Sequence, residues 1–432
     1  MPLPDKKTSL VRLVAVTLIV GLGAGLAGMG LALLLHFIQH VAYGYSLDAV
    51  ISAESFLQGV SAAAPLRRVL VLVLCGLLAG GGWWALYRFG RPLVSIKKAV
   101  QAPAEAMPLP ETTIHALLQI GTVALGSPLG REVAPREIGA AFAGWLSQRA
   151  GLSAAEARIL IASGAGAGLA AVYNVPLAGG LFVLEVLLGT FSLPALLPAI
   201  ATSGIAALVA WIGLGDEVQY PVMPFSISPS LMVWSVLAGP LLGLAAHGFK
   251  RASTAVTARA PQDWRLLPWN LAVFAGIGLI ATVFPQLLGN GKGPLQLGLA
   301  NNLSLGLAAT LLVLRLAVTL AALRAGAKGG LLTPGMTIGA LLATVLGALW
   351  VMAWPGVPLG AFALIGAAAF LAASMNMPLT AIALILEFTR VGQDLLFPLI
   401  FAVSGSIAID RLCTSVFGSA SRPVALPSAS HP

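Results

Sequence analysis

Residues 169–185 read LAAVYNVPLAGGLFVLE, and residues 371–387 read LAASMNMPLTAIALILE. Both stretches follow the pattern Leu-Ala-Ala-x-x-Asn-x-Pro-Leu, then seven residues, then Glu, at an offset of 202 positions. Chance similarity between helices rich in small residues is the alternative explanation, because such residues recur wherever membrane helices pack closely. The shared Asn-x-Pro-Leu and the equal distances to Glu185 and Glu387 favour a structural repeat.

A second pair of matching stretches lies upstream of each copy. Residues 130–135 read GREVAP and residues 329–334 read GGLLTP, and Ile-Gly-Ala follows each of them at 138–140 and 338–340. Two halves of this kind are typical of transporters whose binding site lies near the bilayer midplane, between the repeats. The sequence therefore predicts a two-repeat membrane protein.

The composition supports a membrane protein. Of the 432 residues, 58% are hydrophobic and 9% are charged, whereas soluble domains carry about 25% charged residues. Apolar runs recur along the chain, and the first, at 13–35, is long enough to cross a bilayer. Others are short and broken by Gly and Pro, which predicts helices that end inside the protein. We expect an all-α fold with broken and re-entrant helices.

The net charge of +9 comes from basic clusters between the apolar runs. Such clusters follow the positive-inside rule and do not indicate nucleic-acid binding. They predict cytoplasmic termini and opposite directions for the spans at 13–35 and 230–248, hence an inverted repeat. The expected organisation is a cytoplasmic N-terminal segment (1–12), a first membrane repeat (13–220), a second, inverted repeat (221–411) and a short C-terminal tail without a soluble regulatory domain (412–432).

The GREVAP turn carries the most informative chemistry. A glycine-rich turn before a helix exposes N–H groups and the positive end of the helix dipole, which together bind anions. The carboxylate of Glu132 would occupy such a site itself, and protonation would free it for another anion. Ionisable residues at membrane depth are functional by default. The alternative is a carboxylate that only caps its own helix.

The other two turns are less specific. In GGLLTP, Thr333 offers a hydroxyl group beside the backbone N–H groups, or it serves only as a helix N-cap. Residues 106–110 read AMPLP and also precede a predicted helix. Met107 taken alone is most simply explained by apolar packing.

These turns, in this order, resemble those of the CLC family of chloride channels and proton-coupled antiporters, whose turns are of the types GSGIP, GK/REGP and GxFxP. The resemblance covers roughly residues 10–420. It implies the CLC fold, a homodimer with one pore in each subunit, and a gating and proton-carrying role for Glu132. The anion-binding residues that it implies are Met107, Gly130, Arg131, Val133, Ala134, Gly330, Leu331, Leu332 and Thr333.

Departures from the family pattern refine the expected function. Met107 stands for the family's central serine, and together with REVAP it resembles the fluoride-transporting branch. Val186 stands where proton-coupled members often carry a second glutamate. No tyrosine follows Tyr220, so Phe417 is the candidate for the family's pore-lining tyrosine. We therefore predict fluoride export in exchange for protons, through a prokaryotic plasma membrane.

Two other functions stay open at this stage. Val186 motivates a passive channel for chloride or mixed halides with the same fold, and an organic-solute transporter is the third candidate. An enzyme is disfavoured, because no nucleophile–base pair, metal cluster or phosphate-binding motif occurs. We expect no cofactor or metal, and the partners are a small inorganic anion, protons and the lipid bilayer.

Three further charged residues lie near the motifs. Lys292, within GNGKGP (289–294), either concentrates anions at an outer mouth or is an ordinary solvated loop lysine. We expect structural roles for Glu185 and Glu387, which are predicted to be buried or to lie at helix ends.

Overall fold

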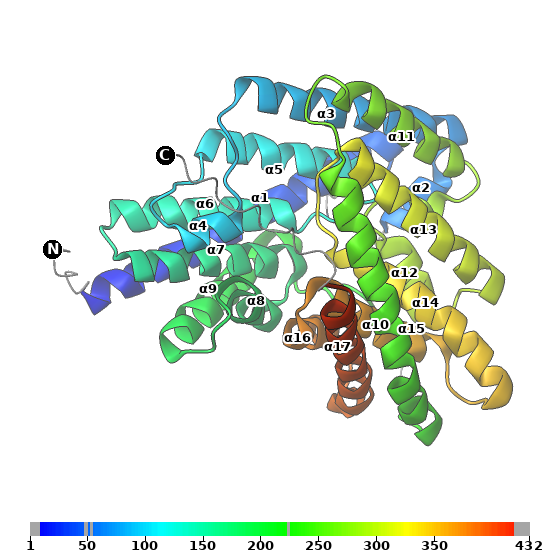
Figure 1. The fold of residues 1–432 in the computed structure, drawn as a ribbon. Coiled ribbons are helices and arrows are strands. Elements are labelled where there is room, and N and C mark those ends of the chain that lie inside the picture. Colours follow the sequence, from blue (N-terminus) through cyan, green and yellow to red (C-terminus); the bar gives the residue numbers. More distant parts are fainter. Residues whose placement is uncertain (1–8, 47–50, 52–54, 223–224, 419–432) are drawn as a thin grey trace, which may run out of the picture.

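The computed structural model describes residues 9–46, 51, 55–222 and 225–418, and they form a bundle of helices (Figure 1). Within this part of the chain, the only extended pairing is a single bridge between Gly130 and Gly330. The N-terminal helices are α1 (Leu10–Tyr43), α2 (Phe56–Ala62), α3 (Pro65–Phe89), α4 (Ile96–Gln101), α5 (Leu109–Ala124), α6 (Val133–Arg149), α7 (Ala154–Tyr173), α8 (Pro176–Phe182), the π-helical segment η1 (Val183–Leu188) and α9 (Leu193–Leu214).

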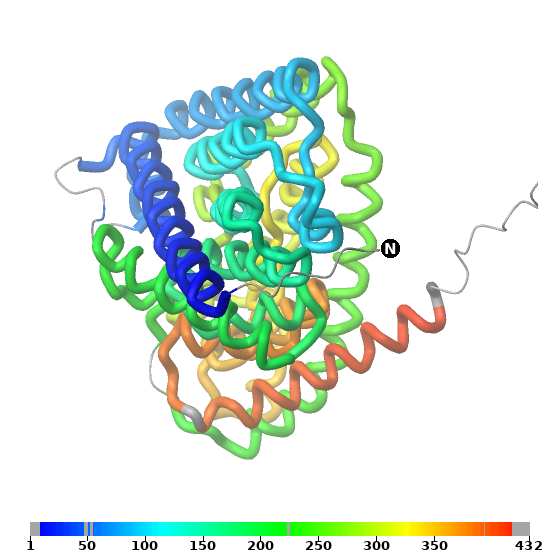
Figure 2. The backbone as a smooth tube through the Cα atoms, turned by 90° about the vertical axis from the view of Figure 1, so that its left-hand side faces the viewer, coloured from blue at the N-terminus to red at the C-terminus, as the bar shows by residue number. Residues whose placement is uncertain are grey.

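The second half has a similar mixture of long and short elements. They are α10 (Pro229–Ala258), α11 (Leu266–Ile280), the 3₁₀ turn η2 (Pro285–Leu287), α12 (Lys292–Leu299), α13 (Leu305–Ala325), α14 (Leu332–Ala353), α15 (Leu359–Met375), α16 (Pro378–Thr389), the 3₁₀ turn η3 (Gln393–Leu395) and α17 (Leu396–Gly418). Figure 2 shows α1, in blue, lying across one face of the bundle. The C-terminal end of α17, in orange-red, extends away from the bundle.

Many of these helices are suited to a bilayer. Among the described residues, eight are long and apolar enough to cross a membrane: α1, α3, α7, α9, α10, α13, α14 and α17. Others, including α11, α15 and α16, are apolar but shorter. A helix of 17 residues such as α15 rises only about 26 Å, less than the ~30 Å hydrocarbon core. The predicted all-α membrane fold with short internal helices is confirmed.

The repeated Asn-x-Pro pattern marks the same local turn in both halves. Asn174 ends α7 with φ 57°, and Asn376 ends α15 with φ 53°. This left-handed conformation is one that Asn tolerates better than most residues. Pro176 and Pro378 then begin α8 and α16, where the missing N–H of proline costs no helical hydrogen bond.

The glutamate at the end of each motif accepts hydrogen bonds from a helix in the opposite half of the chain. The Glu185 carboxylate accepts hydrogen bonds of 2.9 and 2.8 Å from the N–H groups of Leu379 and Thr380, at the start of α16. Glu387 accepts two of 2.8 Å at the start of α8. Each carboxylate thus stabilises a helix N-terminus, which confirms the expected structural roles at helix ends.

Close glycine contacts also recur in both halves. A Cβ atom on Gly164 would lie 2.3 Å from the carbonyl oxygen of Gly139, and one on Gly366 would lie 2.6 Å from that of Gly339. Small residues therefore let α7 approach α6 and α15 approach α14 closely, as in other membrane bundles. These matching contacts agree with two repeats, while the boundary between 220 and 221 stays a prediction.

Candidate anion and proton site

The two glycine-rich turns meet at the centre of the bundle. The N–H of Gly130 donates to the carbonyl of Gly330 at 2.7 Å, and the N–H of Gly330 donates to the carbonyl of Gly130 at 2.9 Å. This pair of bonds places the N-terminus of α6 beside that of α14. Two positive helix ends therefore converge on one point, an arrangement that favours an anion.

The carboxylate of Glu132 occupies that point. Its side chain has 0% exposure. Oε1 accepts a hydrogen bond of 2.8 Å from the N–H of Leu332, and Oε2 accepts one of 3.2 Å from the hydroxyl of Tyr173. A Cβ atom added to Gly330 would lie 1.8 Å from Oε1 of Glu132, and one added to Gly130 would lie 2.1 Å from Oε2. Glycine at both positions is therefore what leaves room for the carboxylate.

Glu132 does not cap its own helix. It is the N-cap residue of α6, yet its side chain makes no capping hydrogen bond there. The carboxylate instead binds Leu332, the first residue of α14. The simple capping alternative is therefore wrong, because the negative charge lies at the N-terminus of a helix in the other half of the chain.

Tyr173 connects the Glu132 carboxylate to the third motif. Its hydroxyl lies 3.0 Å from Oγ1 of Thr333, which is buried. The N-cap of α14 is Leu331, so Thr333 is not the capping residue and its hydroxyl is free to take part in this network. Sequence reasoning missed Tyr173. The available signal was its place directly before Asn174 in the repeated motif, where the second copy has Met375.

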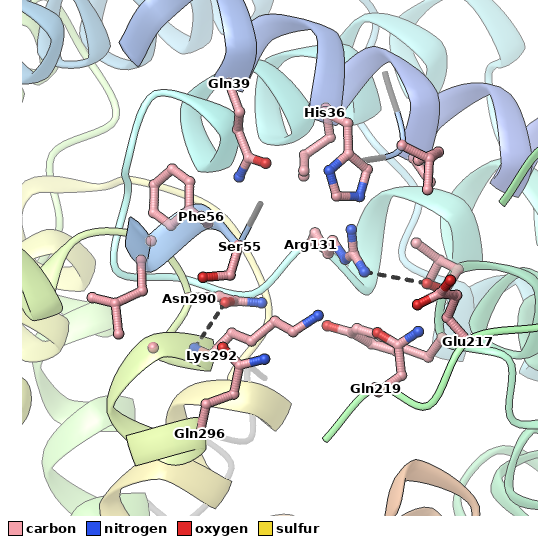
Figure 3. A pocket seen from close by; sticks show the side chains of 18 of the residues that line it. His36, Gln39, Ser55, Phe56, Arg131, Glu217, Gln219, Asn290, Lys292 and Gln296 are labelled. Carbon is pink, nitrogen blue, oxygen red and sulfur yellow. Dashed lines mark hydrogen bonds between the residues drawn. The ribbon is translucent and has the colours of Figure 1, made fainter. Parts of the chain in front are cut away.

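A pocket of about 310 Å³ opens beside the carboxylate, and we call it the Arg131 pocket (Figure 3). The Arg131 guanidinium lies 5.2 Å from the centre of the Tyr173 ring, within range of a cation–π interaction. Lys292 lines the same pocket, with Nζ 5.8 Å from the Tyr220 ring. Lys292 is thus not an ordinary solvated loop lysine, because it begins α12 and faces a pocket with a second cation.

Met107 lies elsewhere. It is buried and lines a separate pocket with Pro108, Trp145 and Gln148, which we call the Met107 pocket. The helix α5 begins next to Met107 and ends next to the Arg131 pocket, which Val123 helps to line. Its 16 residues rise about 24 Å. Met107 therefore lines a different pocket from Arg131, and its part in anion binding stays a prediction.

The two pockets lie at opposite ends of the bundle. The Arg131 pocket is lined by residues near the end of α1, such as Gln39 and His40. The Met107 pocket includes Gln148, near the end of α6. Arg12, at the start of α1, donates to the carbonyl of Ala150 just beyond α6. We call the side where α1 begins the N-terminal side.

The remaining predicted residues contribute less directly. Val133 and Ala134 form the first turn of α6, and Ala134 packs in an apolar cluster. Leu331 packs against apolar residues of both halves. Phe417 is in α17, and its side chain lies outside the described residues.

Arg315 is a further residue that sequence reasoning missed. It is fully buried on α13 and donates hydrogen bonds to the carbonyl oxygens of Pro128 and Gly289, at 2.8 and 2.7 Å. It therefore holds the turn that leads into Gly130. A lone arginine within an otherwise apolar span was the signal available in the sequence.

Residues 75–411 match the family described as voltage gated chloride channel. The chain belongs to this family. Its members are transporters and not enzymes, so the chain is a multi-pass membrane transport protein.

Curated relatives of the chain differ in their named activities. The H(+)/Cl(-) exchange transporter ClcA of Yersinia pseudotuberculosis serotype IB (strain PB1/+) is 29% identical over 375 residues, covering 82% of this chain and 77% of that protein. The voltage-gated ClC-type chloride channel ClcB of Citrobacter koseri is 28% identical over 358 residues, covering 80% of this chain and 84% of that protein. Exchangers and a channel thus both resemble the chain.

Solved structures share the fold. A slow cyanobacterial Cl⁻/H⁺ antiporter superposes with a TM-score of 0.79 at 20% identity, covering 95% of this chain and 98% of that one. A CLC-type fluoride/proton antiporter gives a TM-score of 0.69 at 22% identity, covering 93% and 96%. At these identities the likeness shows the CLC fold and leaves the transported ion open.

Proposed function

We propose that the chain exchanges anions for protons, with Glu132 as both the gate and the proton carrier. The supporting observation is the position of its buried carboxylate, which accepts a hydrogen bond from the N–H of Leu332 at a helix N-terminus. A carboxylate there takes the place of a transported anion. The same group can bind a proton, so anion and proton movements become linked through one side chain.

The proposed transport cycle follows from the change in charge of the Glu132 carboxylate. The ionised carboxylate of Glu132 blocks the site, because it holds the Leu332 N–H and the Tyr173 hydroxyl. Protonation removes its negative charge and weakens both hydrogen bonds, since charge-assisted bonds are the stronger kind. The neutral side chain leaves, and an anion accepts the same donors. When the proton is released, the carboxylate returns and displaces the anion.

Fluoride is the substrate that we propose for this site. The donors are a backbone N–H and a hydroxyl, at a fully buried point with room for the carboxylate only because Gly130 and Gly330 have no side chain. Fluoride is small and is the strongest hydrogen-bond acceptor among the halides, so a compact site with strong donors suits it. Met107 does not support this choice, because it lines a different pocket from the one beside Glu132.

Chloride is the second candidate. The curated relatives are named as chloride exchangers and a chloride channel, and Val186 stands where proton-coupled members often carry a second glutamate. A passive chloride channel would produce a current that reverses at the chloride equilibrium potential at any pH gradient. A coupled exchanger would shift that reversal potential when the pH gradient changes.

We further propose that the N-terminal side faces the cytoplasm of a prokaryotic cell, following the positive-inside rule. The Arg131 pocket then opens outward, and fluoride leaves the cell as protons enter. A homodimer with a pore in each subunit is proposed from the family resemblance. Purified protein in liposomes, monitored by fluoride and chloride electrodes together with a pH probe, tests substrate and coupling in one experiment.

A further inference from the structure

A row of polar side chains follows one buried face of α5. Thr112, His115 and Gln119 are spaced three and four residues apart, and all three are buried. Residues with this spacing share one face of a helix. Polar side chains inside a membrane protein are costly and tend to mark ion or proton pathways. We call these three residues the α5 polar face.

A carboxylate on the neighbouring helix joins this face. His115 Nδ1 lies 2.8 Å from Oε2 of Glu137 on α6, and the Gln119 amide donates to the same oxygen at 2.9 Å. The side chains of His115 and Glu137 are 10% and 16% exposed, whereas Glu132 is fully buried. We refer to His115 and Glu137 as the His115–Glu137 pair.

The pair lies between Glu132 and the N-terminal side. Glu137 follows Glu132 by five positions in the direction of the Met107 pocket, a rise of about 7.5 Å along α6. His115 lies six positions inside α5 from Leu109, which lines the Met107 pocket, and this is a rise of about 9 Å. The pair therefore stands part-way along the route from the gate to the N-terminal side.

Several polar atoms near the pair are unsatisfied. Within the described part of the chain, Thr112 Oγ1, Gln119 Oε1 and Trp83 Nε1 are buried and make no hydrogen bond. The Trp83 ring centre lies 6.3 Å from that of His115. Buried polar atoms usually find a protein or water partner, and water linked to such groups conducts protons. The surroundings of the pair thus suit proton transfer.

Other charged and titratable groups lie around Glu132 and the pair. Arg136, on α6, interacts electrostatically with both Glu132 and Glu137, and its guanidinium lies 4.2 Å from the Phe182 ring. Tyr87, from α3, also interacts electrostatically with Glu137. On α1, His36 and His40 line the Arg131 pocket at the other end, and on α7 Tyr173 binds Glu132. Arg136 thus places one positive charge near both carboxylates, the proposed gate and the member of the pair.

We propose that the His115–Glu137 pair is the proton-transfer station on the N-terminal side of the gate. The proposal rests on the proton exchange proposed above and supplies the function that Val186 cannot perform. In one turnover the O–H bond of protonated Glu132 breaks, a proton binds Glu137 or the His115 imidazole, and Glu132 returns as a carboxylate. The proton then leaves along the α5 polar face. Transport in the other direction reverses these steps.

The test compares Glu137→Gln and His115→Gln with the wild-type protein in liposomes, recording anion and proton fluxes together. We expect proton flux to fall about tenfold or more, in line with the loss of a positioned proton-transfer group, while anion flux continues. The control is Glu105→Gln, which makes the same change on an exposed carboxylate in the ion pair with Lys98. It should leave the proton-to-anion ratio unchanged.

Each outcome separates this proposal from the proposed function. If wild-type protein is coupled and both variants keep its proton-to-anion ratio, the pair is not the station and the exchange mechanism stands. If wild-type protein moves anions without protons, both proposals are overturned. If one of the two variants elutes as aggregate, the other carries the test. Glu137→Asp keeps a titratable group one methylene shorter, so its proton-to-anion ratio should lie between that of His115→Gln and that of the wild-type protein.

Discussion

The hydroxyl of Tyr173 donates a hydrogen bond of 3.2 Å to Oε2 of Glu132. Tyr173 is the last residue of α7, and Glu132 precedes α6. The same hydroxyl lies 3.0 Å from Thr333 on α14. The ends of three helices, α6, α7 and α14, therefore surround the carboxylate that we propose as the gate.

Tyr173→Phe removes one donor to the ionised gate and keeps the ring. A hydrogen bond to a charged group contributes about 1.5–3 kcal/mol, so the carboxylate should be held less firmly in its blocking position. We expect anion flux at a fixed pH to rise about tenfold, from the low end of that energy. Flux measured in liposomes at about pH 7 checks this. Tyr220→Phe is the control, because the Tyr220 ring also packs on Phe388.

Gly330→Ala should disturb the gate directly. The added Cβ atom would lie 1.8 Å from Oε1 of Glu132, so the carboxylate cannot remain where it is. We expect anion flux that depends less on pH, because the closed position is lost. Gly335→Ala, the control, adds a methyl group in the first turn of α14, where its contacts are ordinary ones of 3.5 Å or more. If both variants behaved like the wild-type protein, the described closed gate would be incorrect.

Arg315→Met should destabilise the protein. The guanidinium is buried and binds three backbone carbonyls, those of Leu287, Gly289 and Pro128. Unpaired buried acceptors cost about 1–3 kcal/mol each, so we expect a lower unfolding temperature in detergent and weak transport. Arg251→Met, at an exposed position on α10, is the matched control. Equal thermal stability of the two variants would contradict a positioning role for Arg315.

An ion pair outside the membrane spans predicts a pH effect on stability. Hydrogen bonds from Arg390 and then from Asn174 lower the pKa of Asp216. A carboxyl group with a lowered folded-state pKa stabilises the fold above its unfolded pKa, and that contribution is lost as pH falls through the folded value. Asp216→Asn should therefore lower the unfolding temperature slightly at pH 7, and the difference from wild type should shrink below about pH 4. A difference that grew on acidification would contradict this.

The sequence predicted the repeat because its signals are local. Asn174 and Asn376 need left-handed conformations, and the prolines after them begin helices. Those requirements are set by neighbours in the chain and are visible as residue types. The GREVAP and GGLLTP turns were found for the same reason, because a glycine-rich turn before a helix is a local pattern.

Tyr173 and Met107 show that local sequence patterns do not predict tertiary contacts. The Tyr173 hydroxyl meets Thr333, 160 positions away in the chain, and only the tertiary fold brings the end of α7 to the start of α14. The turn around Met107 was recognised as a helix start. Which pocket that start faces depends on how α5 lies in the bundle, and the sequence does not give that. The spatial relation between a motif and the gate therefore required the three-dimensional structure.

The most direct test of the central claim is proton pumping by an anion gradient, measured in liposomes containing wild-type or Glu132→Gln protein. We expect the wild-type protein to move protons against their gradient when fluoride, or chloride, flows down its own. Glu132→Gln should still pass the anion and should move no protons, because its side chain cannot be ionised. Uphill proton movement retained in Glu132→Gln would contradict the assignment of Glu132 as gate and proton carrier.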